Sequence, residues 1–318
     1  MPEITPLFVT QENTDHLLSW GDAVDALIAG HHLPRPETQD LFLGHHGETL
    51  LNRAAWIPGL GFGTKAVTVY DANRSSGFPT VQGAMIVFDA TNGTVEAFVE
   101  SELVTKWKTA ADSVLGSKFL ARPDSRTLLI VGSGSVALSL VHAYKTTFPN
   151  LDRIFIWNRT QSRAEELIDN INIEGVDIQL ASNLPKAVMR SDIVATATMS
   201  RSPILQGDWI KPGTHVDLIG AFKADMREAD DTLMSKGCLF VDSRKTTIDH
   251  IGELMIPIES GVISNTDIRA DLYDLIGGHE GRTDNDQITV YKNGGGAHLD
   301  LMIAKYAISA NLREAAAA

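Results

Sequence analysis

Residues 128–137 read Leu-Leu-Ile-Val-Gly-Ser-Gly-Ser-Val-Ala, an apolar run that leads directly into two closely spaced glycines. A second apolar run follows at residues 153–157. Together they predict a strand, a tight turn, a helix and a second strand, the unit that binds the pyrophosphate of a dinucleotide. The phosphates of such a ligand lie on free N–H groups at the start of the helix. A G-x-G pattern alone also occurs in ordinary turns, but the two flanking strands favour a binding turn made of Gly132, Ser133, Gly134, Ser135 and Val136.

The end of the second predicted strand indicates which dinucleotide is bound. Proteins that prefer NAD usually have Asp or Glu there, to accept hydrogen bonds from the ribose hydroxyls. This chain has neutral Asn158 followed by Arg159 and Thr160, with Arg163 shortly afterwards. A guanidinium can pair with a 2′-phosphate through two hydrogen bonds, so NADP(H) is predicted to be preferred, with NAD(H) still usable. The alternative is that Arg159 is an ordinary solvated residue at a helix start. Two residues near the end of a later strand complete the predicted cofactor set: Thr196 and Thr198.

Strands and helices alternate from Thr127 onward, which predicts an α/β fold with a doubly wound parallel sheet of Rossmann type. The expected strands are 127–132, 153–158, 176–180, 192–197, 215–220, 238–242 and 286–291. The preceding part reads as a smaller α+β domain, with helices near 14–29 and 105–120 and a mostly antiparallel sheet of strands 49–53, 63–70, 83–88 and 94–99. Residues 121–125 are the expected junction, and a last helix, 298–312, is expected to return to the first domain. The predicted domains are therefore 1–120 with 297–318, for substrate binding and dimerisation, and 121–296, for the dinucleotide.

Composition limits the classes of function. The formal net charge of −13 argues against nucleic acid or an anionic membrane as a partner. Cys238 is the one cysteine, so no internal disulfide can form, and Met1–Ile4 lack the basic start of a secretory leader. No uncharged apolar segment approaches the roughly 18–20 residues that span a bilayer. A cytoplasmic protein is expected, and because the histidines show no ligand spacing, no metal site is predicted.

Three cations in the first predicted domain are candidates for an anion pocket: Arg35, Lys65 and Lys108. Lys65 interrupts an otherwise apolar strand, where a lysine must be exposed at an edge, extended to solvent or paired with an anion. Lys108 is expected near a helix start, where a cation is unfavourable unless it serves a nearby anion. Taken singly, each is more simply an ordinary surface cation. Together they suggest a pocket for a carboxylate.

A candidate acid, Asp225, follows the strand predicted at 215–220. Ligands of doubly wound sheets bind beyond the carboxyl ends of the strands, so Asp225 is in a position to face a bound substrate. The alternative is that Asp225 caps a helix beginning near Met226, with Glu228 at the matching capping-box position. Sequence alone leaves both readings open.

These segments resemble those of the ornithine cyclodeaminase/mu-crystallin family, and the resemblance covers nearly the whole chain. It is carried by Gly63–Lys65, Asn73, Gly77–Gly83, Lys108–Ser113, the Gly132 turn, Ile156–Thr160, Gly220–Glu228 and Gly294–Asp300. The resemblance implies a Rossmann domain joined to a smaller dimerisation and substrate domain. It also implies a homodimer that acts on the imine and amine forms of α-amino acids.

The resemblance further implies roles for particular residues. Arg35, Lys65 and Lys108 would bind the substrate carboxylate, Lys65 would also act in proton transfer, and Asp225 would match the family's catalytic acid. Many members have Arg at the position of Lys108. In this chain the single contact of an ammonium therefore replaces the two hydrogen bonds that a guanidinium can make to a carboxylate. Whether His298 or Asp300 also lines the pocket is left open.

The function implied is NADPH-dependent reduction of a cyclic ketimine, Δ1-pyrroline-2-carboxylate or Δ1-piperideine-2-carboxylate, to L-proline or L-pipecolate. Three alternatives remain at this stage. They are an ornithine cyclodeaminase that recycles NAD, an amino-acid dehydrogenase of the alanine type, and a non-catalytic protein that binds a ligand in an NADPH-dependent way. Net consumption of NADPH, without ammonia release from ornithine, separates the first prediction from the cyclodeaminase.

Overall fold

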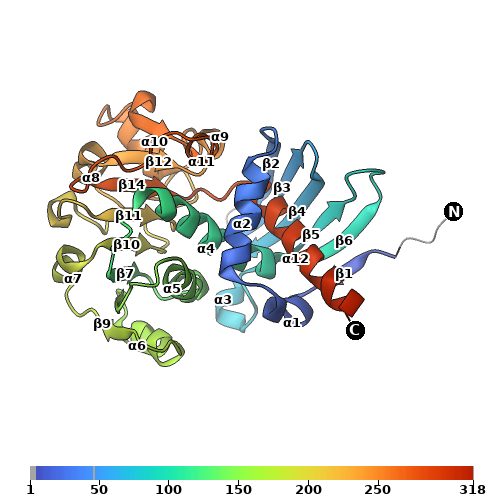
Figure 1. The fold of residues 1–318 in the computed structure, drawn as a ribbon, viewed down its shortest axis with the longest axis horizontal. Helices are drawn as coiled ribbons and strands as arrows, with labels where there is room; N and C mark the ends of the chain where they lie inside the picture. Colours follow the sequence, from blue (N-terminus) through green and yellow to red (C-terminus); the bar gives the residue numbers. More distant parts are fainter. Residues whose placement is uncertain (1–4, 46, 318) are drawn as a thin grey trace. The chain divides into compact units, whose positions relative to one another are not determined.

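The computed structural model describes residues 5–45 and 47–317, and the chain divides into two compact units (Figure 1). The first unit comprises residues 1–108 and 295–318, and the second comprises residues 109–294. The division falls inside helix α4 (Ser101–Leu120) rather than in the 121–125 loop where the sequence placed it. Since α4 is one continuous helix, its two halves contribute to different units. Met1–Ile4, the segment that lacks the basic residues expected at the start of a secretory leader, lies outside the described residues.

The first unit is built on a six-stranded sheet with the order β1-β6-β5-β4-β3-β2. β1 pairs in parallel with β6, and all other neighbours are antiparallel. The strands are β1 (Leu7–Val9), β2 (Glu37–His45), β3 (Glu48–Ile57), β4 (Gly61–Tyr70), β5 (Val81–Phe88) and β6 (Val95–Glu100). The helices are α1 (Gln11–Thr14), the 3-10 turn η1 (Asp15–Leu17), α2 (Trp20–His31), α3 (Asn73–Ser76) and α12 (Ala297–Ala317).

Two details of this unit differ from the sequence prediction. The single helix expected at 14–29 is interrupted, because Ser19 caps α2 by accepting a hydrogen bond from the backbone N–H of Asp22. β1 and β2 were not predicted. β2 lies at an edge of the sheet and most of its residues are exposed, so its sequence shows no clear alternation of buried and exposed positions.

Helix α12 packs against α2 and against strands β3, β4 and β5. In β4 the odd-numbered residues from Gly61 to Val67 are buried, whereas Phe62 is exposed. Successive side chains of a strand point to opposite faces. Lys65 therefore lies on the buried face, the one that α12 covers.

The second unit is built on eight parallel strands with the order β13-β12-β14-β11-β10-β7-β8-β9, which confirms the predicted α/β class. The strands are β7 (Thr127–Val131), β8 (Arg153–Trp157), β9 (Asp177–Leu180), β10 (Ile193–Thr196), β11 (His215–Leu218), β12 (Cys238–Val241), β13 (Ile268–Ala270) and β14 (Thr289–Lys292). The helices are α5 (Ser135–Thr147), α6 (Gln161–Asp169), α7 (Leu184–Arg190), α8 (Asp231–Lys236), α9 (Arg244–Thr247), α10 (Gly252–Glu259) and α11 (Leu272–Ile276), with 3-10 turns η2 (Gly207–Trp209) and η3 (Asn265–Asp267). Strand β13 is short and was not predicted.

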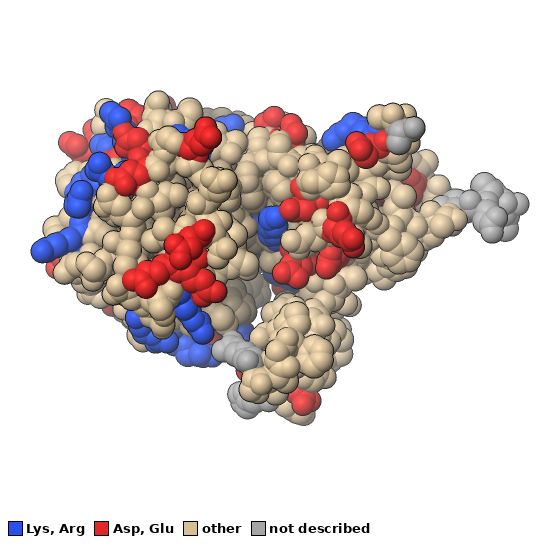
Figure 2. Space-filling view, turned by 90° about the horizontal axis from the view of Figure 1, so that it is seen from below, with Lys and Arg blue, Asp and Glu red and all other residues tan. Residues whose placement is uncertain are grey.

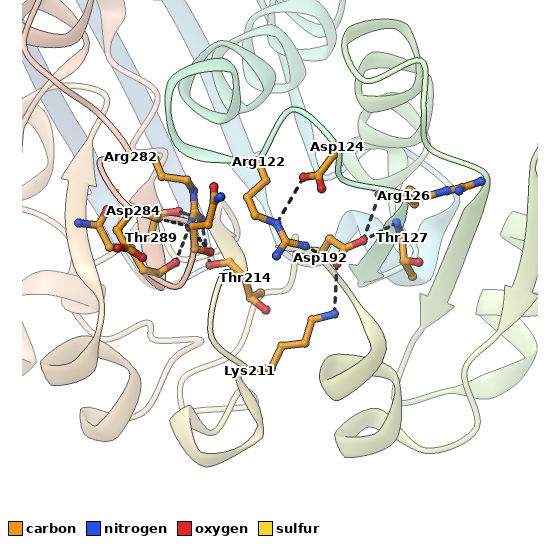
Figure 3. Close-up of polar contacts among 12 residues, drawn as sticks. Arg122, Asp124, Arg126, Thr127, Asp192, Lys211, Thr214, Arg282, Asp284 and Thr289 are labelled. Atoms are coloured by element: carbon orange, nitrogen blue, oxygen red, sulfur yellow. Dashed lines mark hydrogen bonds and ion pairs between the residues drawn. The ribbon is translucent and has the colours of Figure 1, made fainter.

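The core of this sheet is apolar, and the central strands β7, β10 and β11 are buried along their whole length, whereas β9 at one edge is partly exposed. The starting ends of β7 and β10 are joined by Asp192 (Figure 3). Its carboxylate accepts hydrogen bonds from the backbone N–H groups of Arg126 and Thr127 at 3.0 and 3.1 Å. Arg122 and Lys211 donate to its other oxygen at 3.0 and 3.1 Å. Burial alone would raise the pKa of Asp192, but these hydrogen bonds hold it below its ordinary value. The charges at this end of the sheet therefore serve to join the strands.

The surface carries both signs of charge. On the face drawn in Figure 2, Asp and Glu side chains form several groups among smaller groups of Lys and Arg. This distribution agrees with the negative net charge of the chain. Within residues 5–45 and 47–317, no helix is long and apolar enough to cross a membrane.

Candidate active site

Lys65 and Asp300 form a buried ion pair in the first unit. Lys65 lies in β4 and Asp300 in the first turn of α12, and 2.7 Å separate Nζ of Lys65 from Oδ1 of Asp300. The two side chains are 7% and 1% exposed, so little water screens the pair. Thr105 Oγ1 lies 3.5 Å from the same Nζ. Of the situations expected for a lysine in this strand, the structure has the one in which it is paired with an anion.

Two further cations act on this pair. Arg53 is the cross-strand partner of Lys65 in β3, and Lys108 is buried in α4. The positive charges of both residues bear on Lys65 and on Asp300. Arg53 also forms an ion pair with Asp40 at 2.8 Å and donates a hydrogen bond to the carbonyl oxygen of Gly295 at 2.7 Å. Among the described residues, this cluster thus holds three cations, Lys65, Lys108 and Arg53, and two carboxylates, Asp300 beside Lys65 and Asp40 beside Arg53, an excess of one positive charge.

Burial and this charge pattern change how the groups titrate. Burial lowers the pKa of Lys65 to about 8; Asp300 opposes the shift, and Lys108 and Arg53 add to it. Burial alone would raise the pKa of Asp300, but the neighbouring cations hold it below its ordinary value. Burial also lowers the pKa of His298 well below its usual range. Near neutral pH the pair is therefore an ammonium and a carboxylate, and the lysine can release its proton more readily than an ordinary lysine.

The other two predicted substrate residues, Arg35 and Lys108, lie outside β4. Arg35 lies in the connection between α2 and β2 and is exposed. Arg53, which the register of β3 and β4 places opposite Lys65, supplies a guanidinium charge that acts on Lys65 and Asp300. Lys108 is not at a helix start, because α4 begins at Ser101. Lys108 belongs to the cluster because it lies buried in the middle of α4.

Asp225 is exposed and forms an ion pair with Arg201 at 2.7 Å, with side chains 60% and 66% exposed. The hydrogen bond from Arg201 holds the pKa of Asp225 below its ordinary value, so this group is a carboxylate near neutral pH. The alternative reading of Asp225 as a helix cap is wrong. The next helix, α8, begins at Asp231, and its cap is Asp230.

The glycine turn of the second unit connects β7 to α5. Gly132 has φ of +128°, and a Cβ atom there would lie 2.5 Å from the carbonyl oxygen of Ala197, so glycine is required. Gly134 precedes α5 as its N-cap without a side-chain cap, and a Cβ atom there would meet nothing within 4 Å. Open space thus adjoins the N-terminus of α5, and this space fits a phosphate group.

The predicted selectivity residues follow β8. Asn158 donates a hydrogen bond to the carbonyl oxygen of Thr160 at 2.9 Å, and Arg159 and Arg163 are exposed. No acidic side chain stands among residues 158–163. This segment therefore lacks the carboxylate that usually accepts hydrogen bonds from the ribose hydroxyls of NAD.

Glu228 joins the segments that follow β10 and β11. One carboxylate oxygen accepts from Thr196 Oγ1 at 2.8 Å and from the backbone N–H of Gly220 at 2.7 Å. The other accepts from the backbone N–H and the hydroxyl of Thr198 at 2.8 and 2.6 Å. A Cβ atom at Gly220 would lie 1.9 Å from Thr198 O, so glycine allows the two segments to approach. Glu228 thus fixes the carboxyl ends of these strands, the edge where ligands of such sheets bind.

Two of the predicted cofactor residues make this contact. Thr196 is fully buried and its hydroxyl donates to Glu228, and Thr198 is half-buried with the same partner. Sequence reasoning considered Glu228 only as part of a cap. Its role depends on contacts between separate segments, and spacing along the chain gives no sign of them.

Comparison with known proteins decides the family. A model of the ornithine cyclodeaminase/mu-crystallin family matches residues 58–315. The chain belongs to this family. The resemblance found in the sequence is thereby confirmed.

Named relatives and solved structures are similar over most of the chain. Δ1-Pyrroline-2-carboxylate reductase of Paracoccus denitrificans is 56% identical over 302 residues, 95% of this chain and 96% of that protein. Ketimine reductase mu-crystallin of Rattus norvegicus, another similar protein, is 34% identical over 242 residues, 76% and 74% of the two chains. The structure of Thermococcus litoralis Δ1-pyrroline-2-carboxylate reductase in complex with NADH and L-proline has a TM-score of 0.91 and 26% identity, covering 97% of this chain and 98% of that one.

Proposed function

We propose that the protein is an NADPH-dependent reductase of cyclic ketimine amino acids. Its substrate is Δ1-pyrroline-2-carboxylate, which yields L-proline, or the six-membered Δ1-piperideine-2-carboxylate, which yields L-pipecolate. The observation that carries this proposal is the buried Lys65 ammonium beside Asp300, among cations that leave one positive charge. One positive charge matches the single carboxylate of such an imino acid. The names of the relatives from Paracoccus denitrificans and Rattus norvegicus support the same chemistry.

The reduction adds one hydride to C2 of the imine and one proton to its nitrogen. Reduced nicotinamide supplies the hydride when it is bound. Lys65 is the better proton donor, because its pKa is lowered to about 8 whereas Asp225 is already ionised near neutral pH. Asp225 would then stabilise the positive charge of the protonated imine.

The substrate carboxylate would be held by Lys108 and Arg53. Both charges already act on the Lys65–Asp300 pair, and Asp40 and the carbonyl oxygen of Gly295 hold the Arg53 guanidinium in place beside it. Arg35 remains a predicted contributor on the strength of the family resemblance. Binding the carboxylate in this cluster would place the imine close to the proton donor.

The charge pattern favours this activity over the cyclodeaminase alternative. Ornithine carries a second ammonium group at the end of its side chain. Within the described cluster, Asp300 is engaged by Lys65 and Asp40 by Arg53, and three cations are already present. A second ammonium would therefore be repelled, whereas a cyclic imino acid brings no such charge.

The test is an assay of purified protein with NADPH and each candidate substrate. We expect NADPH to be consumed with Δ1-pyrroline-2-carboxylate and proline to form. With ornithine we expect no ammonia, and with pyruvate plus ammonia a much slower reaction. Ammonia release from ornithine without net change in the cofactor would contradict the proposal.

The cofactor would be held by the Gly132 turn and selected by the segment after β8. The free N–H groups at the start of α5 suit the pyrophosphate, and Arg159 and Arg163 suit the 2′-phosphate of NADPH. The contacts of Thr196 and Thr198 with Glu228 support a preformed surface for the rest of the cofactor.

Asn158→Asp tests the cofactor preference. A carboxylate at this position repels a 2′-phosphate and can accept hydrogen bonds from a ribose hydroxyl. We expect kcat/KM with NADPH to fall by about tenfold or more, with little loss for NADH. Asn170→Asp, which adds the same charge at the end of α6, serves as control and leaves the ratio unchanged. An NADH preference in the unaltered protein would contradict the proposal outright.

A homodimer is proposed through the outer face of the six-stranded sheet, meaning the even-numbered side of β4 with its cross-strand neighbours. Phe62 and Trp56 stack there with ring centroids 5.8 Å apart, and Phe62 is 52% exposed. Leu41, Leu43 and Phe8 share this exposed apolar face. An apolar patch of this kind typically marks a protein interface. A similar solved structure, an archaeal alanine dehydrogenase with a TM-score of 0.90 and 25% identity, is named as a dimer.

Phe62→Glu tests this interface. A charge on the outer face would be desolvated in the dimer, so we expect a monomer by light scattering where the unaltered protein is a dimer. Met189→Glu, at an exposed apolar residue of the second unit, serves as control and leaves the mass unchanged. If the Phe62→Glu protein remained dimeric, the dimer interface would have to lie on another surface. The proposed cytoplasmic location rests on the single cysteine, because such a chain needs no oxidising compartment for an internal disulfide.

A further inference from the structure

We propose that Asp300 is a positioning residue for Lys65, whose carboxylate fixes the Lys65 ammonium in place and retains its proton there until the imine is reduced. The inference rests on the proposed function, because it assigns a task to Asp300 in that reaction. It gives the protein a defined alkaline limit of activity.

The geometry of the pair is the first support. Oδ1 of Asp300 lies 2.7 Å from Nζ of Lys65, and both side chains are almost fully buried. The other oxygen, Oδ2, is buried and makes no hydrogen bond to any described residue. The carboxylate is therefore directed to Lys65 and is not part of a wider hydrogen-bond network.

The fold places Asp300 where a carboxylate is stable. It lies in the first turn of α12, which begins at Ala297, and the positive end of a helix favours a negative charge. α12 packs directly on β4, which carries Lys65. The pairing thus follows from two rigid elements, a helix and a strand in the middle of the sheet.

The surroundings of Lys65 make such a partner necessary. Lys108 in α4 and Arg53 in β3 are positive, and both favour the neutral amine of Lys65. His298 in α12 and His31 in α2 also belong to this region, and their rings lie 5.8 Å apart. Burial lowers the pKa of Lys65 to about 8 even with Asp300 in place, so loss of the carboxylate would lower it further.

The consequence for the reaction follows from its balance. The imine gains a hydride at carbon and a proton at nitrogen, so a neutral Lys65 cannot supply the second component. Activity should therefore fall as the pH rises through the pKa of Lys65. Asp300 sets how high that pH is.

Asp300→Asn removes the charge and keeps the size of the side chain. We expect the alkaline limb of the kcat/KM profile to move to lower pH by about one to three units, with a much smaller loss of rate on the acid side. The ionisation of the substrate itself is the same for both proteins and cancels in the comparison. Asp300→Glu, which retains the carboxylate, should bring the limb back toward its original position.

Thr105→Val is the matched control. It removes the weaker contact to Nζ at 3.5 Å without changing any charge, so we expect the limb to stay where it is. An unmoved limb in Asp300→Asn, or an equal movement in Thr105→Val, would overturn the inference.

A second readout needs no substrate. In protein labelled with ¹³C at the lysine ε-carbons, the Lys65 signal reports its titration directly, and its loss in Lys65→Met assigns it. We expect Lys65 to titrate at lower pH in Asp300→Asn, and an unchanged titration would overturn the inference. If the titration moves but the protein does not reduce cyclic ketimines, the proposed function fails while the pairing of Asp300 with Lys65 stands.

Discussion

Lys65→Met is expected to lower kcat/KM for Δ1-pyrroline-2-carboxylate by about 10²–10⁴-fold, the range that general acid catalysis contributes. Methionine matches the length of lysine but can neither donate a proton nor attract a carboxylate. Loss of the proton donor lowers kcat, and loss of one charge from the cluster raises KM for the imino acid. Initial rates of NADPH consumption at several substrate concentrations separate the two effects.

Two control variants accompany this prediction. Lys106→Met alters a partly exposed lysine of α4 that pairs with Asp15 and makes no contact with Lys65 or Asp300, so activity should not change. Lys65→Met alone leaves the buried Asp300 without its partner, and we expect it to lower the free energy of unfolding by about 3–5 kcal/mol. Lys65→Met combined with Asp300→Asn should recover most of that stability and none of the activity. A doubly substituted protein that is active would show that Lys65 is not the proton donor.

Glu228→Ala is expected to have the second large effect, on both stability and cofactor affinity. The carboxylate accepts from Thr196, Thr198 and Gly220 in a fully buried place, so its loss leaves several donors without an acceptor. Unsatisfied buried donors cost about 1–3 kcal/mol each, although the segments can partly relax. We expect a loss of roughly 2–4 kcal/mol in the free energy of unfolding. Because these segments follow β10 and β11, NADPH affinity should fall as well.

Asp230→Ala separates the two effects. Asp230 caps α8 by accepting from the backbone N–H of Leu233 at 2.8 Å, and it also accepts from Gly207. Its loss should cost about 1 kcal/mol of stability, because a cap is removed, without weakening NADPH binding. Fluorescence titration with NADPH and chemical denaturation of both variants make the comparison. If the two variants retained equal NADPH affinity, Glu228 would be a purely structural residue.

The parts of the fold with strong local patterns were predictable. β7, β8 and the Gly132 turn combine buried apolar runs with a glycine that the backbone requires. The pattern of apolar residues along the sequence predicts such segments well. β1 and β2 were missed because a three-residue strand and an exposed edge strand have little pattern. The interruption between α1 and α2 was missed because the apolar residues continue at helical spacing through this segment. The side chain of Ser19 nevertheless starts a new helix by capping its first turn.

The site was predictable only where a single residue is chemically unlike its neighbours in the sequence. Lys65 is such a residue, because a lysine within a buried strand needs a partner. The partner, Asp300, lies in the last helix of the chain, and no local signal connects it with β4. Arg53 was missed for a related reason. Its place beside Lys65 depends on the register of two strands, and a shift of one residue would turn it to the other face.

The most direct test of the proposed function is to follow the hydride itself. Protein is incubated with Δ1-pyrroline-2-carboxylate and NADPH carrying deuterium at both hydrogen positions of nicotinamide C4, and the amino acid formed is analysed by mass spectrometry. The proposal predicts L-proline with one deuterium at its α-carbon, in an amount equal to the NADPH consumed. Proline without deuterium, or no proline while ornithine releases ammonia, would contradict it.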